Sequence, residues 1–166
     1  MTTYEDLVRE TLPFQLMPAV VPQLKSITIG GALAGVGIES SSFTYGFVHE
    51  TILEIDILLP DGTVVAATKD NAHRDLFFGF GNSYGTLGYA LKVKVQLVPV
   101  KEFVKLRHER YSDLDGYFRV LGLVCQDGQV DFVDGTMFEE HELYITTGKC
   151  VDQAEWLSDY TYRHIY

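Results

Sequence analysis

Residues 28–46 have the composition that close contact with an anionic ligand requires. Their sequence is TIGGALAGVGIESSSFTYG, which contains five glycines: Gly30, Gly31, Gly35, Gly37 and Gly46. Because glycine has no side chain, the backbone amides can come close to a bound group, and to a phosphate in particular. The serines at positions 40–42 add hydroxyl donors. Two interpretations stay open: a backbone cradle for a pyrophosphate, or a tightly packed loop.

The pattern of these glycines differs from the common nucleotide-binding motifs. It is not G-x-G-x-x-G in the dinucleotide-binding frame, and no Gly-Lys-Ser/Thr of a P-loop occurs. Any phosphate site would therefore have to be built locally from backbone amides and hydroxyl groups.

Charge and cysteine content narrow the classes of partner. The chain of 166 residues has a formal net charge of −10, which argues against nucleic acid and anionic membrane surfaces. Cys125 and Cys150 form neither a disulfide framework nor a set of metal ligands, and no cluster has metal-site spacing. No apolar run is long enough to span a membrane. We expect a cytoplasmic protein with reduced thiols and no metal.

The elements that would position the glycine segment begin with a helix. Thr2 with Glu5, or Thr3 with Asp6, fits the spacing of a capping box, and Pro13 should end this helix. Residues 26–29 alternate polar and apolar side chains, which predicts a short strand that leads into the glycine segment.

A β-hairpin is the clearest prediction from the sequence. Residues 51–59 and 63–68 should form its strands, with Asp61-Gly62 as a two-residue turn. Asn71 or Asp70 should cap a helix over residues 73–80, and residues 82–88 should form a loop. Residues 89–100 alternate strictly and predict a further strand.

The chain changes character after Pro99. Residues 103–110 predict a strand, Ser112-Asp113 a cap for a helix over residues 114–125, and residues 130–138 and 143–147 a second hairpin. The whole pattern is α+β. We place one domain at residues 1–100 and the start of a second at residues 101–166. Because both ends are abrupt, we expect a piece of a longer protein.

Three ordered motifs resemble one known family. The glycine segment, the Asp-Gly hairpin and DLFFGFGNSYGTLGYALKVKVQLVP are similar to the second half of the FAD-binding domain of vanillyl-alcohol-oxidase/PCMH-type flavoproteins. The sterol Δ24-reductase-like branch shares the G-I-E-S-S-S core. The similarity covers residues 3–100 and continues more weakly through DFVDGTMF and DYTYRHIY.

The resemblance implies a mainly antiparallel, mixed sheet with flanking helices, followed by part of an α+β substrate or cap domain. It implies a non-Rossmann FAD site, with the following residues in contact with the cofactor: Pro22, Gln23, Thr28, Gly30, Gly31, Ala34, Gly35, Gly37, Ile38, Glu39, Ser40, Ser41, Gly88 and Tyr89. The family's first pyrophosphate loop and its covalently linked histidine have no counterpart here. We therefore expect FAD to bind non-covalently, and weakly or not at all in this chain alone.

Several side chains near the expected site have two interpretations. Glu39 would repel a phosphate, so we expect it to accept hydrogen bonds from backbone N–H groups or to face the isoalloxazine. His49 with Glu50 is either a proton-transfer pair or a partly exposed loop histidine with its neighbour. Tyr45 and Tyr84 either contact a ligand or belong to the core.

The resemblance implies a fragment of an FAD-dependent oxidoreductase that transfers a hydride between flavin N5 and a C–H or C=C bond of a small organic substrate. The alternative is a non-catalytic α+β module whose glycine segment packs or binds a partner. Because half a domain leaves apolar surface uncovered, we also expect the chain to self-associate.

Overall fold

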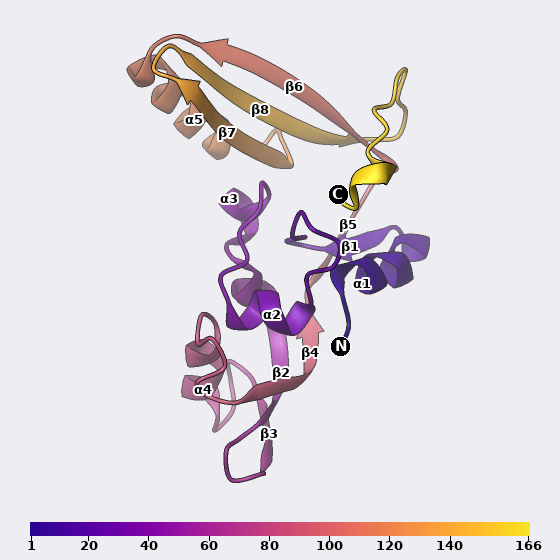
Figure 1. Ribbon diagram of the computed structural model, residues 1–166, viewed down its shortest axis with the longest axis vertical. Coiled ribbons are helices and arrows are strands. Elements are labelled where there is room, and N and C mark those ends of the chain that lie inside the picture. The colour runs from indigo at the N-terminus through magenta and orange to yellow at the C-terminus, as the bar shows by residue number, and fades with distance from the viewer. The chain divides into compact units, whose positions relative to one another are not determined.

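The chain forms two compact units, and each is described by itself. The computed structural model describes residues 1–166, apart from the side chain of Thr161. One unit comprises Met1–Pro99 together with Asp159–Tyr166, and the other comprises Val100–Ser158. Helices and antiparallel sheets occur in both units, so the fold is α+β, as predicted (Figure 1).

The first unit contains two small antiparallel sheets and several short helices. Its elements are α1 (Tyr4–Thr11), η1 (Leu12–Phe14), β1 (Leu16–Pro18), α2 (Ile29–Ala34), α3 (Ser42–Tyr45), η2 (Val48–Thr51), β2 (Ile52–Leu58), β3 (Val64–Ala67), α4 (Arg74–Phe80), β4 (Tyr89–Val95), β5 (Leu97–Pro99) and η3 (Thr161–Arg163). The strand orders are β1-β5 and β3-β2-β4. Both sheets are antiparallel throughout.

Helix α1 begins with the predicted capping box. The Thr3 hydroxyl accepts a hydrogen bond from the Asp6 N–H at 3.1 Å, and the Asp6 carboxylate accepts one from the Thr3 N–H at 3.1 Å. The pair satisfies two amides that the first turn would otherwise leave without partners. The helix ends at Thr11, where the 3₁₀ helix that contains Pro13 begins.

Helix α2 contributes to two separate hydrophobic clusters. Leu33 packs with Ile55, Ile57 and Phe80 of the three-stranded sheet and α4. Its neighbour Ala32 belongs to a second cluster, which contains Tyr4, Val20 and Val48. The two contacts fix the orientation of α2 within the first unit.

Two predictions for the first unit are wrong in detail. Residues 26–29 do not form a strand, because the Thr28 side chain caps α2, which begins at Ile29. The turn of the hairpin is longer than two residues, since the Leu59 N–H donates to the Thr63 carbonyl across Pro60, Asp61 and Gly62. Gly62 has a φ of 85°, the left-handed conformation expected at the end of a three-residue loop.

The start of α4 also differs from the expected cap. Its N-cap residue is His73, whose side chain makes no capping hydrogen bond. Asn71 Oδ1 instead accepts from the His73 N–H at 3.0 Å, so Asn71 orders the turn that precedes the helix.

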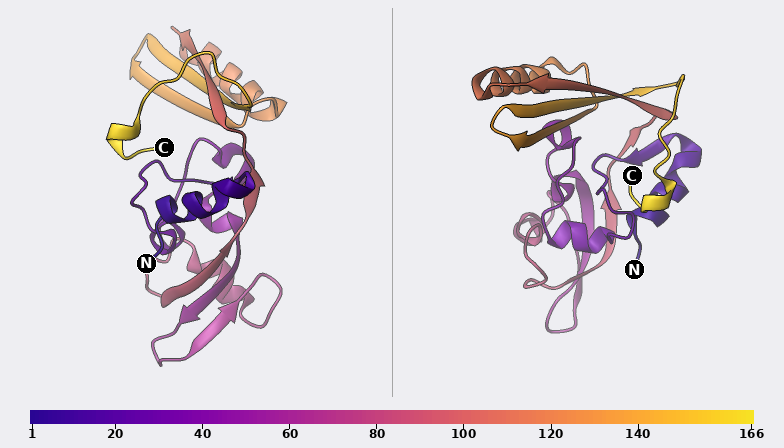
Figure 2. Two further views of the ribbon diagram at one scale, coloured as in Figure 1. Left: turned by 90° about the vertical axis from the view of Figure 1, so that its right-hand side faces the viewer. Right: turned by 45° about the horizontal axis from the view of Figure 1, so that its top comes forward.

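The second unit is a three-stranded antiparallel sheet with one helix along a face (Figures 1 and 2). Its elements are β6 (Phe103–Tyr111), α5 (Leu114–Asp127), β7 (Phe132–Glu139) and β8 (Glu142–Val151), in the strand order β6-β8-β7. As predicted, Asp113 caps α5, and Asp113 Oδ1 accepts from the Gly116 N–H at 2.6 Å. Tyr117 of the helix packs on Leu143 and Ile145 of the central strand.

The last eight residues lie with the first unit, although we expected all of residues 101–166 to form one domain. The reason is a set of backbone contacts: Leu24 and Ile165 form an antiparallel bridge, and the Tyr166 N–H donates to the Gln23 carbonyl at 3.0 Å. The chain thus leaves the first unit after Pro99 and returns to it at Asp159.

Candidate functional site

The first turn of α2 contains a backbone amide without a described acceptor. The Ile29 N–H donates to the Thr2 carbonyl at 3.1 Å, and the Gly31 N–H donates to Thr28 Oγ1 at 3.1 Å. Between them, the Gly30 N–H has no acceptor among the residues that the structure describes. A Cβ atom added to Gly30 would meet nothing within 4 Å. Packing does not explain this glycine, and an acceptor from outside the chain can approach its amide.

The other glycines of the segment are explained by packing. A Cβ on Gly37 would lie 2.5 Å from Cγ2 of the fully buried Val48. A Cβ on Gly35 would lie 3.1 Å from the Gly31 carbonyl oxygen, and one on Gly31 would lie 2.9 Å from Thr28 Oγ1. Packing therefore accounts for Gly31, Gly35 and Gly37, and the cradle interpretation stays open at Gly30.

The Glu39 carboxylate makes a contact with the preceding loop. Its Oε1 atom accepts a hydrogen bond from the Gln23 N–H at 2.8 Å. This confirms the interpretation that Glu39 accepts from backbone N–H groups. Burial and the nearby Glu39 charge both raise the pKa of Tyr4, with burial the larger cause, so the Tyr4 phenol stays neutral at physiological pH.

Two of the three serines at positions 40–42 form hydrogen bonds within the chain. The buried Ser41 hydroxyl donates to the Ala19 carbonyl at 2.9 Å, and Ser42 Oγ accepts from the Glu39 N–H at 3.0 Å. Ser41 therefore has a structural role. Ser40 is half-buried, and its hydroxyl has no partner among the described residues.

The remaining expected contacts in this segment differ in exposure. Pro22 is buried, Ala34 packs against the cluster around Leu33, and Ile38 is 60% exposed. The Ala34 carbonyl accepts from the Tyr84 N–H at 2.9 Å, which joins the end of α2 to the loop that follows α4.

Gly88 and Tyr89 are not brought to the open part of α2. Gly88 is buried, has a φ of 137°, and leaves no room for a Cβ beside the Leu58 carbonyl of β2. The next residue, Tyr89, is 71% exposed, whereas Ala90 packs in the cluster that contains Leu33. Because side chains alternate along a strand, Tyr89 faces away from α2.

Tyr45 and Tyr84, for which the sequence left two interpretations open, lie in different environments. Tyr45 packs against the cluster around Val48, as a core residue would. Tyr84 is 75% exposed with a φ of 51°, so the core interpretation is wrong for it. A left-handed conformation at a tyrosine is uncommon, and here the Tyr84 N–H contact with Ala34 holds it.

The structure shows no proton-transfer pair at His49 and Glu50. Glu50 Oε2 accepts from the Phe47 N–H at 2.7 Å, and no described hydrogen bond joins Glu50 to His49. His49 lies in η2 with its ring stacked on Phe47, at 5.6 Å between centroids.

Two buried polar atoms near the glycine segment were not singled out from the sequence. His49 Nδ1 and Ser83 Oγ are the buried side-chain atoms that lack a partner among the described residues. Their chain neighbours hold the segment, since the Val48 N–H donates to the Gly37 carbonyl and the Tyr84 N–H to the Ala34 carbonyl. Such unpaired buried atoms show only in the tertiary structure.

Within the described part of the chain, no three His, Cys, Asp or Glu side chains gather in a way that could hold a metal ion. None of the described helices combines the length and apolarity needed to cross a bilayer.

Comparisons with known proteins bear on this site. Residues 2–68, which include α1, the Gln23 loop and the whole glycine segment, match the family model described as FAD binding domain. Human Delta(24)-sterol reductase is 35% identical over 136 residues, which is 82% of this chain and 26% of that protein. The chain belongs to the PCMH-type FAD-binding flavoprotein family.

Two further relatives also match this chain. Pea Delta(24)-sterol reductase is 44% identical over 103 residues, covering 62% of this chain and 18% of its own length. Cytokinin dehydrogenase 1 of Arabidopsis thaliana is 27% identical over 131 residues, covering 78% of this chain and 23% of its own length. The chain therefore lies near the sterol reductase branch. It spans about a fifth to a quarter of the length of these relatives.

Proposed function

We propose that this chain supplies part of the FAD site of a flavin-dependent oxidoreductase. The observation that carries the proposal is Gly30, whose amide has no described partner and whose missing side chain leaves open space. The match of residues 2–68 to the FAD-binding family supports the same segment independently. Gly30 fits an incoming phosphate or carbonyl oxygen, because a free N–H can donate to it at close range.

The proposed site includes Gly30, Thr28, Gln23 and Glu39. Thr28 holds the first turn of α2 in place, and the bond from the Gln23 N–H keeps the Glu39 carboxylate engaged. Ser41 and Gly88 are not included as contacts, because their environments are filled by this chain. Ser40, with its free hydroxyl, remains a proposed donor.

When bound, FAD supplies the hydride donor or acceptor at its N5 atom. We propose that the whole protein transfers a hydride between this atom and a C–H or C=C bond of a small organic substrate. The names of the reductase relatives favour a sterol C=C bond, whereas the name of the cytokinin dehydrogenase favours a C–H bond of another substrate class.

We propose that FAD attaches non-covalently and binds weakly to this chain alone, because the donors that the glycine segment offers are backbone amides and hydroxyl groups. A cytoplasmic location is supported by the two free cysteines, Cys125 and Cys150.

The experiment compares Gly30→Gln with Gly122→Gln by FAD titration, using flavin fluorescence. Gly122 is a matched control, because it is also helical and a Cβ there would also meet nothing within 4 Å. Both variants should keep the stability of the unsubstituted chain, since glutamine is the better helix former. FAD affinity should fall at least tenfold for Gly30→Gln and stay unchanged for Gly122→Gln.

The titration is run on this chain and on the chain joined to the part of pea Delta(24)-sterol reductase that precedes its match to this chain. Tighter binding in the joined protein, with the same sensitivity at Gly30, supports the proposal. Failure of both proteins to bind FAD at 1 mM overturns it and favours a non-catalytic module.

A further inference from the structure

Residues 164–166 lie along the loop that leads to the proposed FAD site. Leu24 and Ile165 form an antiparallel bridge, the Lys25 N–H donates to the His164 carbonyl at 3.4 Å, and the Tyr166 N–H donates to the Gln23 carbonyl at 3.0 Å. The pairing resembles one rung of a β-ladder between segments about 140 positions apart in the sequence.

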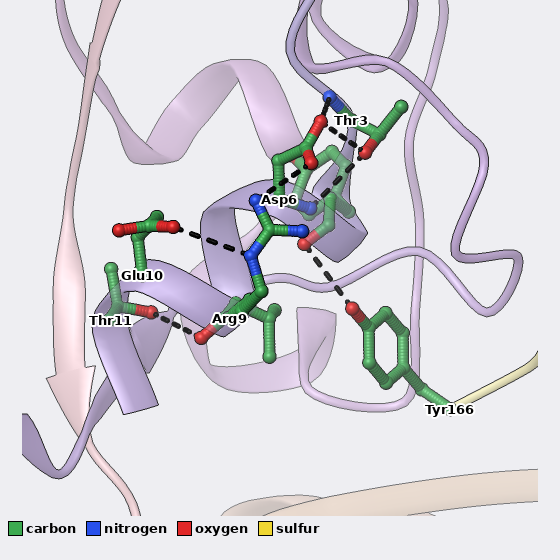
Figure 3. Close-up of polar contacts among 8 residues, drawn as sticks. Thr3, Asp6, Arg9, Glu10, Thr11 and Tyr166 are labelled. Atoms are coloured by element: carbon green, nitrogen blue, oxygen red, sulfur yellow. Dashed lines mark hydrogen bonds and ion pairs between the residues drawn. The ribbon is translucent and has the colours of Figure 1, made fainter. Parts of the chain in front are cut away.

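The Tyr166 side chain adds two contacts to this pairing. Its hydroxyl donates to the Tyr4 carbonyl at 3.2 Å, at the start of α1 (Figure 3). Lys25 Nζ lies 5.1 Å from the centroid of the Tyr166 ring, within the range of a cation–π contact. Burial, with smaller effects from Glu5 and Asp6, raises the pKa of Tyr166, so the hydroxyl remains a donor at neutral pH.

The same loop is held from its other side by α1. The Glu5 N–H donates to the Lys25 carbonyl at 3.1 Å, and the Tyr4 N–H donates to the Ile27 carbonyl at 2.9 Å. The loop thus has a partner on each side. Its attachment to α1 uses positions 25 and 27, whereas the position of Gln23 depends on residue 166.

Gln23 connects Tyr166 directly to the glycine segment. Its carbonyl accepts from the Tyr166 N–H, and its own N–H donates to Glu39 Oε1 at 2.8 Å. Loss of this donor would let the negative charge of the carboxylate move toward a bound phosphate and repel it. The Gln23 N–H is therefore one of the contacts that set the position of the Glu39 carboxylate.

We propose that Tyr166 is a positioning residue for the FAD site: it fixes Gln23, which in turn holds the Glu39 carboxylate. This inference rests on the proposed function. Tyr166 follows the second unit in the sequence, yet it would act on a site that the first 41 residues of the chain form.

The test measures amide hydrogen exchange and FAD affinity in the joined protein described above. Tyr166→Ala removes the ring and the hydroxyl, whereas Tyr166→Phe keeps the ring over Lys25. Tyr160→Ala is the matched control, since Tyr160 is an exposed tyrosine of the same segment whose side chain makes no described contact. Far-UV circular dichroism verifies that all variants fold.

We expect the Gln23 and Lys25 amides to exchange at least tenfold faster in Tyr166→Ala, with FAD binding weaker by about threefold to tenfold, the size of one hydrogen bond. FAD affinity should fall less in Tyr166→Phe than in Tyr166→Ala, and it should be unchanged in Tyr160→Ala. In a Glu39→Ala background, Tyr166→Ala should have no further effect on FAD affinity, because the residue acts through Glu39.

Three results would overturn the inference. The first is unchanged exchange at Gln23 in Tyr166→Ala, and the second is faster exchange with unchanged FAD affinity. The third is an equal loss of FAD affinity from Tyr166→Ala with Glu39 present and in the Glu39→Ala background. If the unsubstituted joined protein binds no FAD, the proposed function itself fails, and this control shows it before any variant is compared.

Discussion

At the scale of single residues, Gly30 and Gly37 show that glycines in one segment can lie in different environments. Gly30 borders open space, whereas Gly37 lies against Val48, which is fully buried. The two positions are only seven residues apart in one small-residue segment. Composition marks the segment as unusual, and the surroundings of each Cα decide which glycine can face a ligand.

The first prediction concerns Gly37. Gly37→Ala should lower the free energy of unfolding by about 1–3 kcal/mol, because the new methyl overlaps the Val48 side chain, which has no room to move. Denaturant unfolding, followed by circular dichroism, measures the change. Gly122→Ala is the control and should be neutral or stabilising; an equally stable Gly37→Ala would contradict the packing argument.

The second prediction concerns the pH dependence of the Asp6 contact. Hydrogen bonds from the Thr3 side chain and backbone, with a smaller contribution from Arg9, lower the pKa of Asp6 below its ordinary value of 3.8. Because the folded-state pKa is lowered, the contribution to stability is present above pH 3.8 and is lost as pH falls through the folded-state pKa.

The amides of the first turn of α1 report this loss by hydrogen exchange. Their protection should decline below about pH 4. In Asp6→Asn the decline should be absent, with lower protection throughout the range. A decline that persists in Asp6→Asn would assign the pH effect to another group.

At the scale of elements, local signals in the sequence predict where α1 and α5 begin and which consecutive strands form hairpins. The capping box at Thr3, the cap at Asp113 and the hairpin around Gly62 were all predicted at or near their observed positions. These signals work because they depend on contacts within about four residues. The strand predicted at residues 26–29 failed because Thr28 has an equally local alternative, the cap of α2.

The third prediction concerns the cap of α5. Asp113→Ala should destabilise the second unit by about 1 kcal/mol, because the Gly116 N–H loses its acceptor. Asp115→Ala removes an equal charge from the same turn without removing a described contact. Denaturant unfolding should separate the two variants; equal effects would mean that charge, rather than the cap, determines the stability.

At the scale of the whole molecule, both units leave apolar side chains in water. On the sheet of the second unit, Leu106 is 52% and Phe138 is 68% exposed. Exposed apolar side chains of this size contribute to surfaces that associate when they gather into a patch. Self-association therefore remains a prediction.

The fourth prediction tests this association by light scattering across a range of concentrations at 150 mM salt, where the repulsion from a net charge of −10 is screened. The mass should exceed that of a monomer, and Leu106→Lys should reduce it. Val64→Lys makes the same change at a 54% exposed position of the first unit. A monomer at all concentrations would refute the prediction.

The sequence by itself determined the α+β class, the caps of α1 and α5, the second hairpin and the family, because each depends on short spacings or on an ordered set of motifs. The glycine segment was marked as a candidate site for the same reason. Expected contacts at Ser41, Gly88 and Tyr89 could not be separated from the rest, since burial and strand alternation were needed to place them.

Only the tertiary structure decided which groups meet across long separations. The bond from Gln23 to Glu39, the open space at Gly30 and the return of Tyr166 to the first unit join segments that no local pattern connects. The physical reason is that a hydrogen bond or a cavity depends on distances between atoms. Those distances between remote segments are set by the packing of the hydrophobic clusters around α2.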